Sequence, residues 1–99
     1  MIIIRNVFRL KFGKAKEAKA LIPVFKAINA RHGVTSTRVL TDLTGESYTL
    51  VFESGHASLS EFESKMQTLF TDPEWGSVYE KFLPLVNSGY REIFTLVGE

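Results

Sequence analysis

Residues 2–12 read IIIRNVFRLKF, and this stretch decides the fold because its side chains alternate between two faces. The first face is apolar apart from Asn6, and it carries Ile2, Ile4, Phe8, Leu10 and Phe12. The second face mixes aliphatic residues with Arg5, Arg9 and Lys11. A period of two over this length predicts a β-strand whose first face packs against the core.

The next segments of the chain change from a period of two to helical spacing and back again. Apolar residues at helical spacing predict a helix over 14–32. Pro23 lacks the amide hydrogen that a helix needs, so a kink or a second short helix is expected there. Alternating segments predict strands over 37–43 and 47–53, and Gly45 marks the hairpin loop between them.

The last third of the chain contains two helix starts and one strand. Ser58 and Glu61 form a capping box, which begins a helix that extends to residue 70. Asp72 and Pro73 suit the first positions of a further short helix, and residues 90–97 form the last predicted strand. The whole order is strand, helix, strand, strand, helix, strand. It predicts one α+β domain over residues 1–99, with a ferredoxin-like βαββαβ fold, an antiparallel four-stranded sheet and an extra short helix before the last strand.

Composition limits the classes of function. The chain has 99 residues and no cysteine, which excludes disulfides and zinc–thiolate sites. Its apolar runs are far shorter than the roughly 20 residues of a membrane span, so no membrane span and a cytoplasmic location are expected. The sequence has no Gly-rich phosphate-binding fingerprint and no histidine pattern typical of a metal site, so no cofactor and no metal are expected.

Charge is distributed unevenly along the chain. Residues 1–38 contain nine Lys or Arg and one acid, whereas residues 39–99 contain three bases and ten acids. A basic half could form a nucleic-acid surface, but residues 47–52 lack the basic Gly-aromatic motif of RNA-binding relatives of this fold. We therefore expect no nucleic acid, and we interpret the two halves as neutralising each other within a chain or between chains.

The second face of the predicted sheet is too apolar for solvent and too charged for a core. It carries Ile3, Val7 and Val51 beside Arg5, Arg9, Thr49 and Glu53. A second copy of the chain could bury the aliphatic side chains and pair the arginines with carboxylates. This pattern predicts a homodimer through the sheet face, and a monomer with a semi-polar open sheet is the alternative.

Two segments resemble a known family. Residues 6–14, NVFRLKFGK, resemble the first strand and turn of the dimeric α+β barrel superfamily. Residues 72–75, DPEW, and the later 83–86, LPLV, are similar to the NIPSNAP family within that superfamily. The resemblance implies a ferredoxin-like subunit, two of which pack sheet to sheet to form a dimeric α+β barrel. It also implies a pocket between the sheet and the helices of each subunit.

The candidate ligand-binding residues follow from that pocket. Asn6 lies on the core face, where a buried amide needs a partner, either a ligand or the backbone or a buried water. The other candidates are Phe8, Tyr48, Trp75, Tyr79 and His56. The aromatic residues could equally be core packing, and Tyr48 or Tyr90 could lie only at a rim. His56, in the segment SGHA, could be a base over the pocket mouth or an exposed loop histidine.

Three functions remain open from the sequence. The favoured one is a NIPSNAP-like homodimer of unassigned activity that binds a small apolar molecule between sheet and helices. The second is a cofactor-independent monooxygenase or isomerase, and the third is a structural or regulatory interaction module. Haem degradation is disfavoured because Val78 stands where such relatives have the histidine that ligates iron. No catalytic residue can be assigned from spacing alone.

Overall fold

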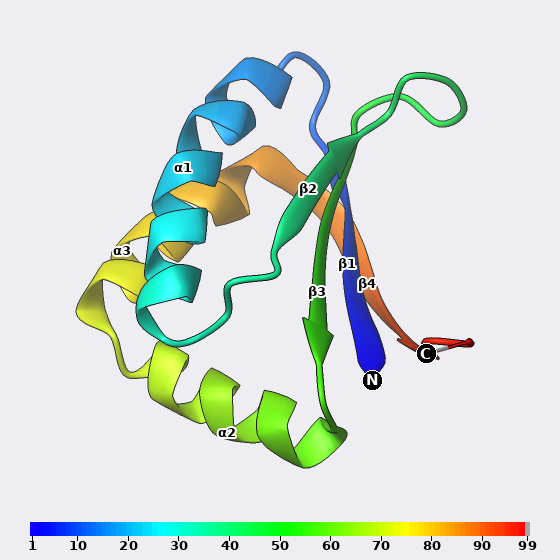
Figure 1. The fold of residues 1–99 in the computed structure, drawn as a ribbon. Helices are drawn as coiled ribbons and strands as arrows, with labels where there is room; N and C mark the ends of the chain where they lie inside the picture. The colour runs from blue at the N-terminus through cyan, green and yellow to red at the C-terminus, as the bar shows by residue number, and fades with distance from the viewer. Residues whose placement is uncertain (99) are drawn as a thin grey trace.

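The computed structural model describes residues 1–98, which form one sheet covered on one face by helices (Figure 1). The four strands are antiparallel and have the order β2-β3-β1-β4, which confirms the predicted ferredoxin-like fold. In chain order the elements are β1 (Ile2–Leu10), α1 (Ala15–Arg31), β2 (Arg38–Thr41), β3 (Thr49–His56), α2 (Leu59–Phe70), α3 (Pro73–Phe82), the 3-10 turn η1 (Leu83–Leu85) and β4 (Val86–Thr95).

Strand β1 is central, and its alternation determines which side chains meet the helices. Ile4 and Leu10 are buried on the helix-covered face, as the apolar alternation predicts. Phe12 lies beyond the strand and is 88% exposed, so its place on the core face is wrong. Strand pairing ends at Leu10, and the chain turns at Gly13, whose φ of 81° suits glycine.

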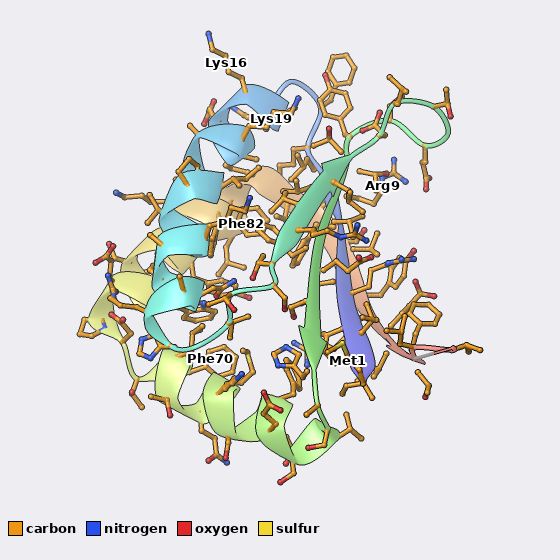
Figure 2. All side chains as sticks on the ribbon, in the orientation of Figure 1. Met1, Arg9, Lys16, Lys19, Phe70 and Phe82 are labelled. Carbon is orange, nitrogen blue, oxygen red and sulfur yellow. The ribbon has the colours of Figure 1, made fainter. Side chains whose placement is uncertain are left out.

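Four phenylalanines join the sheet to the helices. Phe8 of β1 and Phe52 of β3 meet Phe25 of α1 and Phe82 of α3 in edge-to-face contacts. The distances between ring centroids lie between 5.1 and 6.2 Å. Figure 2 shows Phe82 in the space between the helix layer and the sheet. Such edge-to-face contacts stabilise the core beyond the burial of area alone.

The capping residues behave as their sequence pattern predicts. Ser58 begins α2, and its hydroxyl accepts the backbone N–H of Glu61 at 3.1 Å. Asp72 begins α3 and accepts the N–H of Glu74 at 2.9 Å. Arg31 and His32, from the end of α1, also bind the Asp72 carboxylate, so this cap ties two helices together. Hydrogen bonds from Arg31 and then His32 hold the pKa of Asp72 well below its usual range.

Helix α1 passes through Pro23 without a break. The helix is one element from Ala15 to Arg31, so the predicted alternative of a second short helix is wrong. Pro23 lies on the exposed side of α1. Water can therefore reach the carbonyl that the proline leaves without a partner, and the helix continues.

The last strand begins earlier than the sequence predicts. β4 starts at Val86 rather than residue 90, and Gly89 lies within it opposite Phe8. A Cβ on Gly89 would lie 2.8 Å from Phe8 Cδ1, which is closer than real contacts allow. This glycine is therefore required by the close approach of a ring on the neighbouring strand and does not end the preceding structure.

The charges on the open face of the sheet are paired within the chain. The Glu53 carboxylate of β3, only 6% exposed, accepts hydrogen bonds from Arg5 of β1 and Arg38 of β2. These two arginines, Arg38 first, lower the pKa of Glu53. Arg9 pairs with Glu46 in the same way. The four arginines of the basic first part are thus paired with acids of the second part within the chain.

Within residues 1–98, none of the helices combines the length and the apolar character that crossing a membrane requires. The same residues contain no group of three or more His, Asp or Glu side chains arranged to hold a metal ion.

The close approach of Phe8 to Gly89 predicts the effect of one methyl group. Gly89→Ala should lower the free energy of unfolding by about 1–3 kcal/mol, because the added Cβ overpacks the sheet against Phe8. Gly76→Ala is the matched control: nothing lies within 4 Å of its added Cβ, and alanine favours the helix by about 0.5–1 kcal/mol. Urea unfolding measures both variants. A Gly89→Ala variant as stable as Gly76→Ala would contradict the close packing.

Candidate functional site

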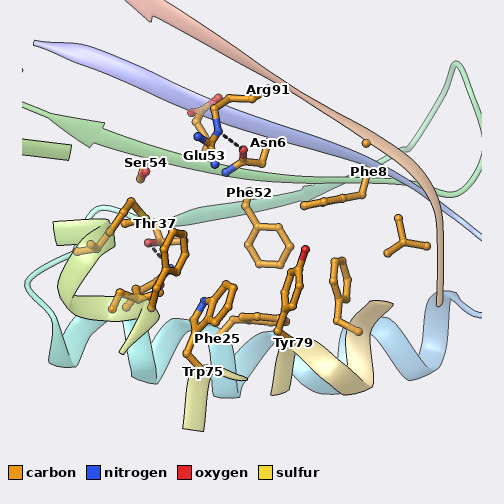
Figure 3. A pocket seen from close by; sticks show the side chains of 18 of the residues that line it. Asn6, Phe8, Phe25, Thr37, Phe52, Glu53, Ser54, Trp75, Tyr79 and Arg91 are labelled. Carbon is orange, nitrogen blue, oxygen red and sulfur yellow. Dashed lines mark hydrogen bonds between the residues drawn. The ribbon is translucent and has the colours of Figure 1, made fainter. Parts of the chain in front are cut away.

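A cavity of about 680 Å³ lies between the sheet and the helices, where the resemblance implies a pocket. The sheet side of its wall comes from β1, β3 and β4, and the helix side from all three helices (Figure 3). On the sheet side the central residues are Asn6, Phe8, Phe52, Ser54 and Arg91; on the helix side they are Phe25, Leu69, Trp75, Tyr79 and Phe82. The wall is mostly apolar and rich in aromatic side chains, and most of its polar groups lie on the strands.

Asn6 has a partner on the neighbouring strand. It lies opposite Arg91 in the register of β1 and β4, and Arg91 Nε donates to Asn6 Oδ1 at 2.8 Å (Figure 3). Within residues 1–98, the partner of Asn6 is thus a side chain and not the backbone. Among residues 1–98, no group hydrogen-bonds to the Asn6 amide nitrogen, which leaves this donor for a molecule in the cavity.

Trp75 and Tyr79 form a flat section of the helix wall. Their rings stack with centroids 4.6 Å apart and an interplanar angle of 15°, because residues four apart share one face of α3. Phe70, at the end of α2, extends the stack at 4.7 Å from Trp75. Both predicted residues lie at the cavity, together with Phe8.

His56 does not lie where the sequence places it. It is the last residue of β3, not a loop residue, and only 2% of it is exposed, so the exposed loop histidine is wrong. The strand continues through Gly55 because the Ser36 hydroxyl and Ile3 pair with that glycine. His56 is absent from the cavity wall, but its Nε2 lies 2.9 Å from the hydroxyl of Ser54, which does line the cavity.

The environment of His56 disfavours the charged form of its ring. The ring packs edge-on against Phe62, and its Nδ1 is buried with no partner within residues 1–98. Burial lowers the pKa of His56 below its ordinary value of 6.5, and the positive charge of Lys65 lowers it further, against an opposing effect of Glu61. A neutral imidazole that contacts Ser54 can exchange a proton with that hydroxyl at the cavity wall.

Tyr48 does not reach the cavity. It precedes β3 with a φ of 62°, packs against the core, and lies 5.3 Å from the Phe12 ring between centroids. The alternation of residues 47–53 placed it on the correct side of the sheet, but at the end remote from Asn6. Tyr90, 59% exposed, lies at the rim, which is one of its two predicted places.

Sequence reasoning missed Ser54, Arg91 and the pair formed by Asn29 and Thr37, whose side chains are 3.3 Å apart at the cavity. Ser54 could have been found, since it is two residues after Phe52 on the same face of β3. Arg91 could not, because its position depends on the register of β4 against β1.

Several solved structures share this arrangement of strands and helices. An uncharacterised NIPSNAP domain protein from Burkholderia xenovorans matches with a TM-score of 0.86 over 98% of this chain and 95% of its own, at 17% identity. The fold is that of the NIPSNAP-domain proteins. A NIPSNAP family protein from Agrobacterium tumefaciens matches with a TM-score of 0.86 and 21% identity, over 95% of this chain and 90% of its own. SnoaB, a cofactor-independent oxygenase from Streptomyces nogalater, matches with a TM-score of 0.73 and 15% identity, over 99% of this chain and 94% of its own.

These similarities confirm the resemblance to the NIPSNAP proteins at the level of fold. The identities are low, so the comparison does not transfer an activity to this chain. No protein-family model matches the sequence, and no curated protein matches it either. Function therefore has to be argued from the cavity itself.

The burial of His56 predicts a titration. An NMR titration of the histidine ring protons should give His56 a midpoint below 6.5, because folding disfavours its charged form. The unfolded chain then binds a proton more readily, so this residue makes the folded state less stable as the pH falls below about 6.5. His56→Gln identifies the resonance by its loss, whereas His32→Gln should leave it unchanged. A midpoint at or above 6.5 would contradict the buried neutral ring.

Proposed function

We propose that this chain is a NIPSNAP-like homodimeric protein that binds a small, largely apolar molecule in the cavity between sheet and helices. The observation that carries the proposal is the cavity of about 680 Å³ with an aromatic wall. Sites for small molecules in proteins have volumes of about 300–1,000 Å³ and mostly apolar linings with few polar groups. This cavity has both properties.

The aromatic wall favours a ligand with a flat apolar body. The stacked rings of Trp75 and Tyr79 present a surface on the helix side, and Phe8 and Phe52 present rings on the sheet side. The space is open to solvent on one side, and the rings that face it lack some of the van der Waals contacts that a close-packed interior would give them. A ligand that fills the space between these rings would restore them.

The homodimer is supported by what the open face of the sheet exposes. Leu40, Tyr90 and Phe94 are large side chains on that face and are 42%, 59% and 42% exposed. The Glu53 carboxylate on the same face is already bound by Arg5 and Arg38. A partner that covers this face would bury apolar area over a carboxylate that is already paired, which favours an isologous interface.

The dimer predicts the effect of a charge on the open face. Wild-type protein at micromolar concentration should sediment as a species of about twice 11.2 kDa. Leu40→Asp should give a monomer, because a lone carboxylate would be buried in the interface. Leu59→Asp is the matched control, since Leu59 is 51% exposed but lies on α2, away from the sheet face. A wild-type monomer at that concentration would contradict the proposal.

The cavity predicts binding of a neutral aromatic probe. Native mass spectrometry of freshly purified protein should show a retained small molecule, and 2-naphthalenemethanol should change the fluorescence of Trp75, the only tryptophan. Ser54→Phe places a ring in the cavity and should weaken probe binding by roughly tenfold or more, about 1.4 kcal/mol. Thr68→Phe, on the exposed side of α2, should leave it unchanged. If no molecule is retained and the probe does not bind, the interaction module is the better function.

A cofactor-independent oxygenase or isomerase is the second candidate. The observation that favours it is the contact between neutral His56 and the Ser54 hydroxyl, which gives the cavity wall a proton acceptor. Asn6 could polarise a substrate carbonyl through its free amide nitrogen. This function requires turnover of an aromatic substrate that Asn6→Ala abolishes while the protein stays folded.

A further inference from the structure

The arginines of this chain differ in one respect that bears on the ligand. Within residues 1–98, four of the five arginines form ion pairs with carboxylates: Arg5, Arg9, Arg31 and Arg38. Arg91 forms none, and it is the arginine that lines the cavity. Its positive charge therefore faces a space that a small molecule can enter.

The Arg91 guanidinium is held in place even though it is not neutralised. Its Nε donates to Asn6 Oδ1 at 2.8 Å, and its Cζ lies 5.3 Å from the centre of the Phe62 ring. Among residues 1–98, no acceptor binds its two terminal nitrogens. These nitrogens are the pair that a planar carboxylate engages with two parallel hydrogen bonds.

No acid of the cavity wall competes for Arg91. Glu53 is the only acidic residue among those that line the cavity. Its carboxylate is bound by Arg5 and Arg38, and it projects from the opposite face of β3, since it pairs with Arg5 across the strands. A single cation in an otherwise uncharged, aromatic cavity attracts an anion.

We infer that the ligand is an aromatic or alicyclic carboxylate, with its carboxyl group on Arg91 and its ring against Trp75 and Tyr79. This inference rests on the proposed function, because it names the class of molecule that the cavity binds. Asn6 orients Arg91 through Oδ1, and its amide nitrogen is a further donor beside the carboxyl group. The polar side chains of the cavity thus recognise the head group, and the aromatic wall recognises the body.

Isothermal titration calorimetry with two probes of nearly equal size tests the inference. Wild-type protein should bind 2-naphthoate roughly tenfold or more tightly than neutral 2-naphthalenemethanol, as a charge-assisted pair adds affinity for the anion alone. Arg91→Gln should remove this preference while keeping affinity for the neutral probe. Arg91→Lys keeps the positive charge but lacks the two parallel N–H donors of the guanidinium, so it should keep part of the preference for 2-naphthoate. The preference should also decrease as salt is raised.

Lys19→Gln is the matched control, because it removes the same charge from an exposed position of α1 that does not line the cavity. It should leave both affinities unchanged, and circular dichroism should show that all variants are folded. If both probes bind equally to wild type, or if Arg91→Gln keeps the preference, the carboxylate inference is overturned and the cavity proposal stands. If neither probe binds, the cavity proposal itself is wrong.

Discussion

The contact of four phenylalanines from four elements is the constraint on which the rest of the structure depends. Phe8, Phe25, Phe52 and Phe82 meet edge to face, and they fix the distance between the sheet and the helices α1 and α3. All four also line the cavity, so the same rings that hold the layers together form its inner wall. Core packing and pocket wall, which the sequence posed as alternatives for the aromatic residues, are here two aspects of one cluster.

The two faces of the sheet differ in whether their arginines form ion pairs. On the open face, Glu53 is bound by two arginines, and Arg9 is bound by Glu46. Arg5 and Arg9 therefore already have carboxylate partners within the chain, and the proposed second chain would mainly cover aliphatic and aromatic side chains. On the covered face, Arg91 forms no ion pair with any of residues 1–98. Paired charges suit a surface for self-association, and an unpaired arginine suits a site for an anion.

Local chemistry made most of the fold predictable, whereas contacts between distant strands did not. The alternation of β1 and the caps at Ser58 and Asp72 depend on residues close in sequence, and the structure confirms them. The sequence predicts the last strand only from residue 90, because the requirement for Gly89 within β4 comes from Phe8, far away in the chain. His56 was assigned to a loop because Ser and Gly precede it, yet pairing with β1 extends β3 through them. The candidate site was predictable only in part. Asn6, Phe8, Trp75 and Tyr79 follow from local patterns, whereas the position of Arg91 depends on the register of β4 against β1.

The position of Arg91 on β4 connects the two parts of the proposed function. β4 is an edge strand paired only with β1, and its side chains alternate between the faces of the sheet. Arg91 points toward the cavity, while Tyr90 and Phe94 belong to the open face that a partner would cover. An edge strand with exposed side chains on both faces gains order when one face is buried. Self-association would therefore order the strand that carries the guanidinium, so the proposed homodimer would support the site without contributing a residue to it.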